Sequence, residues 1–204
     1  MTDPNPRITL TTFIDFLVAP SSSRLRIVRQ AKDLYLRDYE PYSDYWKQLR
    51  ERIVEMHENG EPPQVLDQFL ASLRNGRKFE NYANCVAAYK KWLGRKSANW
   101  IGTAAVDWEG PGLVVRVNPE LGLELNGNRH SIKLYFRAEK LSAFRAQSTL
   151  GLLSLAMPQN DGGRLRAILD VRNGKLHTAT SSREDVARTL EVEAIAFREF
   201  WNRL

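Results

Sequence analysis

The fold of this chain depends most on residues 120–136, which read ELGLELNGNRHSIKLYF. Apolar and polar side chains alternate on both sides of a central pair, Asn126 and Gly127. An Asn-Gly pair between two alternating segments is a strong hairpin signal, because a type I′ turn needs positive φ at both central residues. The pattern therefore predicts two antiparallel strands joined by a two-residue turn.

This turn also sets the register of the hairpin. Counting outward from it, Leu125 faces Asn128, and the last pair brings Glu120 opposite Lys133. Because side chains alternate between the two faces of a strand, one face is expected to be core and the other polar. The core face carries Leu121, Leu123, Leu125, Ile132, Leu134 and Phe136, and the polar face carries Glu120, Glu124, Arg129 and Lys133.

Further strands and helices are predicted around this hairpin. Strands are expected at residues 103–108, 113–117 and 164–172, followed by a return strand to about residue 180, and helices at residues 141–156 and at the C-terminus. A second Asn-Gly pair, Asn173 and Gly174, precedes the return strand. If it forms the same two-residue turn, Asp170 faces His177, a pairing that can orient an imidazole.

The N-terminal half has a different pattern. Between residues 11 and 96 apolar side chains recur every three or four positions, and proline or glycine interrupts the pattern repeatedly. This spacing predicts five amphipathic helices, which we expect to form a bundle. The expected fold class is α+β, with a helical bundle domain at residues 1–96 and a mainly antiparallel sheet domain with covering helices at residues 97–204.

The chain is basic, with 30 Lys and Arg against 24 Asp and Glu and a formal net charge of +6. A positive surplus favours anionic partners such as DNA or RNA, because phosphate contacts release counterions. Three groups are candidates for phosphate contact. They are Arg24, Arg26, Arg29 and Lys32; Lys90, Lys91, Arg95 and Lys96; and Arg164, Arg166 and Arg172. The first two are explained more simply as a solvated helix face and as compensation of a helix dipole. The third group shares one strand parity with Asp170 and predicts a basic edge of the sheet.

Other features narrow the class of protein. No apolar segment approaches the ~20 residues of a membrane span, so no membrane partner is expected. A single cysteine, Cys85, cannot form an internal disulfide, and the first ten residues lack the pattern of a secretory signal. We therefore expect a cytoplasmic protein. Three isolated histidines and one cysteine make no zinc pattern, and no cofactor is expected from these residues.

The order of strands and helices in residues 100–180 resembles the core of the PD-(D/E)XK nuclease superfamily, including its RecB-like branch. The resemblance rests on short motifs: Pro119 with Glu120, then Lys133, then Gln147 on the following helix. It implies that Glu120 and Lys133 are the catalytic residues of a metal-dependent nuclease, in which Mg²⁺ activates water beside a phosphate. Ser131 departs from the pattern, because the superfamily has Asp or Glu at this position.

With one acid missing, we expect a degenerate nuclease-like core that binds the phosphate backbone of DNA or RNA without efficient cleavage. The residues expected to bind nucleic acid are Lys133, Arg164, Arg166 and Arg172. A simpler interpretation of Glu120 and Lys133 is a cross-strand ion pair on a solvated face. The alternative function is a protein-interaction or regulatory module that docks a protein partner through its helical N-terminal half.

Overall fold

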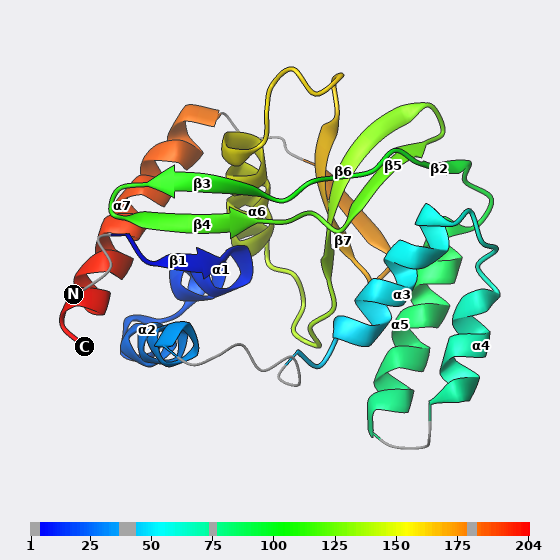
Figure 1. The fold of residues 1–204 in the computed structure, drawn as a ribbon, viewed down its shortest axis with the longest axis horizontal. Helices are drawn as coiled ribbons and strands as arrows, with labels where there is room; N and C mark the ends of the chain where they lie inside the picture. Colours follow the sequence, from blue (N-terminus) through cyan, green and yellow to red (C-terminus); the bar gives the residue numbers. More distant parts are fainter. Residues whose placement is uncertain (1–4, 37–43, 74–76, 179–182) are drawn as a thin grey trace.

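The computed structural model describes residues 5–36, 44–73, 77–178 and 183–204 (Figure 1). Its helices are α1 (Leu10–Val18), α2 (Ser21–Leu36), α3 (Lys47–Glu58), α4 (Val65–Ser72), α5 (Arg77–Leu93), α6 (Ala143–Ala156) and α7 (Arg183–Asn202). Its strands are β1 (Arg7–Thr9), β2 (Ala98–Trp100), β3 (Val106–Gly110), β4 (Leu113–Val117), β5 (Leu121–Leu125), β6 (Asn128–Tyr135), β7 (Leu165–Asp170) and β8 (Lys175–Thr178). The fold belongs to the α+β class, as predicted. No helix within the described ranges is long and apolar enough to cross a membrane.

The strands form two mixed sheets. One has the order β1-β4-β3 and the other the order β2-β5-β6-β7-β8. Most neighbours are antiparallel, but β1 runs parallel to β4 and β6 runs parallel to β7. Parallel neighbours need a crossover connection, and α6 supplies it between β6 and β7. The predicted antiparallel character therefore holds for the hairpins and not for the β6–β7 pair.

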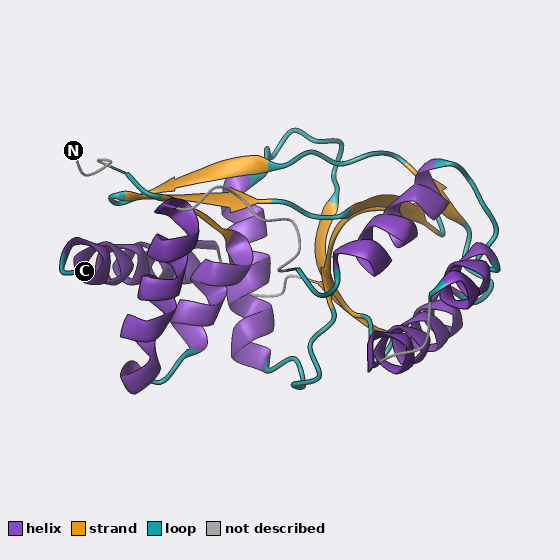
Figure 2. Ribbon diagram, turned by 60° about the horizontal axis from the view of Figure 1, so that its bottom comes forward, coloured by secondary structure: helices purple, strands orange, loops and turns teal. Residues whose placement is uncertain are grey.

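The apolar residues form two cores, one around each sheet, and the five-stranded sheet also contributes Tyr135 and Ile168 to the core of the three-stranded sheet. In the first core, α1, α2, α6 and α7 pack with the three-stranded sheet, and the rings of Phe16 and Phe197 meet edge to face at 5.0 Å. In the second core, α3, α4 and α5 pack with the five-stranded sheet, and Trp46 stacks on Phe136 at 5.3 Å. Figure 2 shows the first group of helices on one face of the three-stranded sheet and a strongly curved second sheet beside α3 to α5.

The N-terminal helices are divided between these two cores instead of forming the expected single bundle. Helices α1 and α2 pack against α6 and α7, which come from the other end of the chain. Arg24 of α2, for example, pairs with Glu193 of α7 at 3.0 Å. Each core therefore contains residues from both sides of positions 96 and 97. The amphipathic spacing predicted the helices correctly, but it carries no information about which apolar surface each one covers.

The β5–β6 hairpin has the predicted register. Its pairs run from Leu125 with Asn128 to Leu121 with Ile132, and the turn residues Asn126 and Gly127 have φ of 49° and 85°. Both positive angles agree with a type I′ turn. The predicted core face of the hairpin is buried in the second core.

The second Asn-Gly hairpin, between β7 and β8, does not have the predicted register. Asp170 pairs with Lys175 and Ile168 pairs with His177, so the expected pairing of Asp170 with His177 is wrong. The carboxylate of Asp170 accepts hydrogen bonds from the backbone N–H and the Nδ2 of Asn173, at 3.2 and 2.8 Å. A longer loop of residues 171–174, held by Asp170, therefore replaces the two-residue turn.

Candidate functional site

Glu120 and Lys133 meet at the end of the β5–β6 hairpin farthest from its turn. The Nζ of Lys133 donates to Oε1 of Glu120 and also to the backbone oxygen and Oδ1 of Asn118, at 3.1 and 3.4 Å. The side chains of Lys133 and Glu120 are only 10% and 7% exposed. The predicted pairing is therefore present, but as a buried ion pair and not on a solvated face.

The second carboxylate oxygen of Glu120 accepts a hydrogen bond from the backbone of strand β6. The backbone N–H of Glu120 donates to the oxygen of Ile132 at 3.0 Å, which is the last ladder bond between the two strands at this end. Beyond it, the N–H of Leu134 donates at 2.8 Å to Oε2 of Glu120. Because a buried N–H without an acceptor is costly, this carboxylate takes the place of a backbone carbonyl. Both oxygens of Glu120 thus have structural partners.

Ser131, at the position of the missing acid, is covered by backbone. Its side chain is fully buried, and its Oγ has no hydrogen-bond partner among the described residues. It lies opposite Gly122, and a Cβ on Gly122 would be 1.7 Å from the carbonyl oxygen of Gly102. Residues 101–103 therefore run directly over the sheet on the face to which Ser131 points, and only glycine fits at position 122.

These residues do not fit the Mg²⁺ site that the nuclease resemblance implies. Mg²⁺ needs free oxygen ligands, usually one or two carboxylates. The carboxylate of Glu120 is shared between Lys133 and Leu134, and Ser131 offers a buried hydroxyl. Gln147 is exposed and lines a groove between α6 and α7, away from this ion pair. In the described residues no group of three or more His, Cys, Asp or Glu side chains is placed to hold a metal ion.

Of the three arginines predicted to form a basic edge, Arg164 and Arg166 lie together beside Asp161, and Arg172 lies apart from them. Arg164 precedes β7 and donates to the carbonyl oxygens of Gly102 and Ile101, at 2.6 and 3.1 Å, which holds the covering segment in place. Arg166 is buried and pairs with Asp161. Arg172 follows β7, and its Nε donates to the oxygen of Phe136 at 2.8 Å. The expected common edge is therefore not formed.

Arg172 lies instead in a basic cleft between the end of α5 and the β7–β8 loop. The cleft has a volume of about 510 Å³ and is lined by Ala88, Lys91, Trp92, Lys96, Arg172, Asn173 and Gly174. This lining carries three cations and no carboxylate. The cleft thus brings Lys91 and Lys96, from the second basic group of the sequence, together with Arg172, from the third.

The cations of the basic cleft are held by the fold to different degrees. Arg172 donates through Nη2 to Asn81 at 3.0 Å, and its guanidinium lies 5.3 Å from the ring centre of Trp46. Lys96 donates to the backbone oxygen of Trp92 and lies over its ring. Lys91 is exposed and has no hydrogen-bond or ion-pair partner within the described chain. Trp92 thus orients Lys96. Because the ring of Trp92 is itself buried, it offers no surface on which a base could stack.

Sequence reasoning missed this cleft because its two sides are brought together by tertiary packing. A Cβ on Gly174, which has φ of 59°, would lie 3.3 Å from the backbone oxygen of Ala88 and 3.4 Å from the Cβ of Trp92. The β7–β8 loop therefore packs directly on α5. The basic residues themselves were visible in the sequence, but their proximity was not.

Two other reactive side chains are poor candidates for catalysis. Cys85 is fully buried in the second core, and burial raises the pKa of its thiol to about 11. A protonated, buried thiol is a weak nucleophile. Burial and the nearby Lys175 lower the pKa of His177, whose strand neighbour is the apolar Ile168. Among the described residues, no hydrogen bond or ion pair gives either group the partner that nucleophilic or acid-base chemistry needs.

A scan of the chain against protein-family models and a search of curated proteins found no match.

Proposed function

We propose that this protein binds the phosphate backbone of nucleic acid at the basic cleft and does not cleave it. The observation that carries the proposal is the cleft itself, where Lys91, Lys96 and Arg172 line one cavity without a carboxylate. Cations gathered in a concave site release counterions when they meet phosphates, and this release drives backbone binding. The formal net charge of +6 supports the same partner.

The geometry of the cleft suits a chain of phosphates better than a single base. Arg172 is fixed through Phe136 and Asn81, so one oriented guanidinium is available for phosphate oxygens. Lys91 and Lys96 are both exposed and act as point charges beside it. Contacts of this kind carry no sequence information. We therefore expect binding that tolerates any base sequence. Lys133, Arg164 and Arg166 support the fold in this proposal and do not contact phosphate.

The first test measures binding to a fluorescently labelled oligonucleotide of mixed sequence, used both as a single strand and as a duplex. Fluorescence anisotropy reports the binding at several NaCl concentrations. We expect the double variant Lys91→Ala/Lys96→Ala to weaken binding about ten-fold at low salt and to make the salt dependence shallower by about 1.5 in log-log slope. Both side chains are exposed, so the fold should be unaffected. A matched control, Arg29→Ala/Lys140→Ala, removes two exposed charges outside the cleft.

Three outcomes would contradict this proposal. The first is that the unmodified protein does not bind the oligonucleotide at low salt. The second is that the two double variants lose affinity equally, which would assign binding to net charge alone. Competition by polyglutamate as strong as that by unlabelled oligonucleotide would indicate an acidic protein partner instead of nucleic acid.

The second test concerns cleavage. We expect the purified protein to leave single- and double-stranded DNA and RNA intact in the presence of Mg²⁺ or Mn²⁺, because Glu120 has no free oxygen for a metal and Ser131 is covered. Gel analysis of the products measures this directly. Cleavage by the unmodified protein that disappears in a folded Lys133→Ala variant would contradict the expectation and make this protein an enzyme.

A second candidate is a protein-interaction role for the helical N-terminal half. The observation that favours it is the exposure of two adjacent large side chains near the C-terminal end of α2, Leu34 and Tyr35, which are 65% and 41% exposed. Large apolar side chains at a surface are common where proteins bind one another. Binding through such a surface should change little with salt, whereas phosphate binding weakens steeply, so the same salt series separates the two candidates.

A further inference from the structure

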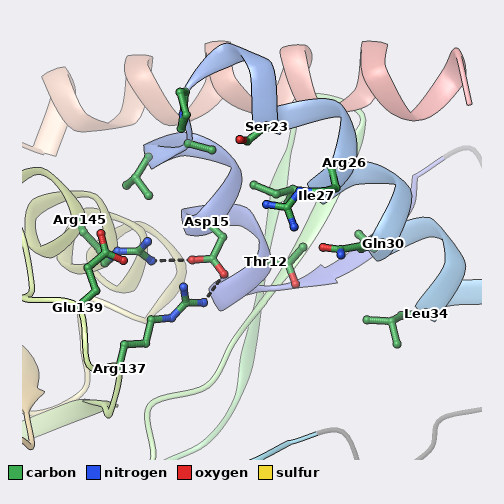
Figure 3. A pocket seen from close by; sticks show the side chains of 14 residues that line it. Thr12, Asp15, Ser23, Arg26, Ile27, Gln30, Leu34, Arg137, Glu139 and Arg145 are labelled. Atoms are coloured by element: carbon green, nitrogen blue, oxygen red, sulfur yellow. Dashed lines mark hydrogen bonds and ion pairs between the residues drawn. The ribbon is translucent and has the colours of Figure 1, made fainter.

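A second cavity, which we call the arginine pocket, lies between α1, α2 and the segment from β6 to α6 (Figure 3). Its volume is about 460 Å³, within the roughly 300–1,000 Å³ of small-molecule sites. Three arginines reach it: Arg26 from α2, Arg137 from the β6–α6 connection and Arg145 from α6. It shares no lining residue with the basic cleft.

Asp15 of α1 holds two of these arginines in place. Its Oδ1 accepts a hydrogen bond from Nη1 of Arg145 at 2.7 Å, and its Oδ2 accepts one from Nη2 of Arg137. The side chain of Arg145 is 8% exposed and that of Arg137 is 39% exposed, so they form the deep and the shallow side of the pocket. Each guanidinium has further N–H groups, for which the described residues supply no acceptor. Arginines fixed in this way lose little conformational freedom when an anion binds.

Arg26 supplies a third positive charge. It is exposed, and no described residue forms a hydrogen bond or ion pair with it. Figure 3 shows it extending from α2 toward the carboxylate of Asp15. The lining therefore holds three guanidinium groups against two carboxylates, Asp15 and Glu139, and the first of these is already shared by Arg137 and Arg145. The lining thus keeps a net positive charge, which favours an anionic ligand.

The rest of the pocket is suited to an organic group. Apolar side chains of α1 and α2 form one wall, and the amide of Gln30 and the hydroxyl of Thr12 lie beside them. The apolar wall comprises Val18, Ala19, Ile27 and Leu34. An inorganic ion would fill only a small part of this volume and leave the apolar wall in contact with water.

We propose that the arginine pocket binds a small organic phosphomonoester, with its phosphate between the guanidinium groups and its organic part against Ile27 and Leu34. A phosphomonoester has three terminal oxygens, which can accept from the N–H groups of Arg26, Arg137 and Arg145 that Asp15 leaves free, and it carries a charge of about −1.5 to −2 at neutral pH. A carboxylate has only two oxygens, so it would accept hydrogen bonds from fewer of these N–H groups. The proposal is independent of nucleic-acid binding at the basic cleft.

Isothermal titration calorimetry with four probes tests the chemistry of the ligand. The probes are ribose 5-phosphate, adenosine 5′-monophosphate, adenosine and inorganic phosphate. We expect both phosphomonoesters to bind and to raise the melting temperature of the protein, adenosine not to bind, and inorganic phosphate to bind at least about ten-fold more weakly than the tighter ester. Equal binding of inorganic phosphate would overturn the organic ligand, and binding of neither ester would overturn the site.

Variants of the pocket test its position. Arg26→Ala and Arg137→Ala are each expected to weaken binding of the tighter ester by about ten-fold or more, because each removes charge-assisted hydrogen bonds to the phosphate. Arg29→Ala is the matched control, since Arg29 is exposed on the same helix and does not line the pocket. The Lys91→Ala/Lys96→Ala variant should bind the ester normally. Unchanged affinity in Arg26→Ala and Arg137→Ala, or an equal loss in Arg29→Ala, would overturn the proposal.

Discussion

Replacing Glu120 with alanine is expected to lower the free energy of unfolding by about 3–5 kcal/mol, because the change leaves Lys133 charged and without its partner in a buried place. The Nζ of Lys133 would keep only the two oxygens of Asn118, and the N–H of Leu134 would lose its acceptor. Urea denaturation at neutral pH measures the loss as a lower midpoint at unchanged m-value.

Two further variants separate the charge from the hydrogen bond. Glu120→Gln keeps an acceptor for Leu134 and should be less destabilising than Glu120→Ala. Combining Glu120→Gln with Lys133→Met removes both charges, and we expect it to recover most of the loss. The control is Glu51→Gln, whose ion pair with Lys47 is exposed and should contribute less than about 0.5 kcal/mol. A fully stable Glu120→Ala variant would contradict the structural role of this pair.

The parts of the fold that local chemistry determines were predictable from the sequence. The Asn126–Gly127 turn requires two positive φ angles, and that requirement alone sets the register that places Glu120 beside Lys133. The amphipathic spacing likewise predicted the helices of the N-terminal half, and their existence is confirmed. In both cases the determining residues are close in sequence to the structure they form.

Other features depend on contacts between distant residues. The Asn173–Gly174 pair resembles the first turn, but the carboxylate of Asp170 competes for the same backbone and lengthens the loop. The burial of Glu120 and Lys133 could not be predicted from the local sequence either. Alternation placed them on a polar face, and only the packing of the first core on that face, where Tyr135 and Ile168 lie, excludes water from it. The basic cleft and the arginine pocket each join elements that are far apart in the sequence.

His57 shows the same difference between local and tertiary information. Its place near the end of α3 suggests a cation that interacts with the helix dipole. The structure instead buries it in the second core, where its Nε2 lies 2.5 Å from the hydroxyl of Tyr89. Burial lowers the pKa of His57 from 6.5 to about 4 and raises the pKa of Tyr89 above its usual value. Both groups are therefore neutral in the folded protein at pH 7.

This shift predicts a loss of stability in mild acid. Below pH 6.5 the unfolded chain binds a proton at His57 that the folded protein does not accept until the pH approaches 4. Stability from the neutral imidazole is thus fully present above pH 6.5 and falls as the pH drops through this window. A shift of this size corresponds to about 3 kcal/mol between pH 7 and pH 4, at ~1.4 kcal/mol per pKa unit.

Carboxylates also titrate in this range, so the unfolding free energy must be measured against pH for both the unmodified protein and His57→Gln. We expect the variant to be less stable at pH 7, because it disturbs the contact with Tyr89, and to lose about 3 kcal/mol less on acidification to pH 4. NMR titration of the His57 ring gives the folded-state pKa directly. Parallel pH profiles for the two proteins, or a ring pKa at or above 6.5, would show that the imidazole is protonated freely in the folded state and that its burial against Tyr89 does not limit stability in acid.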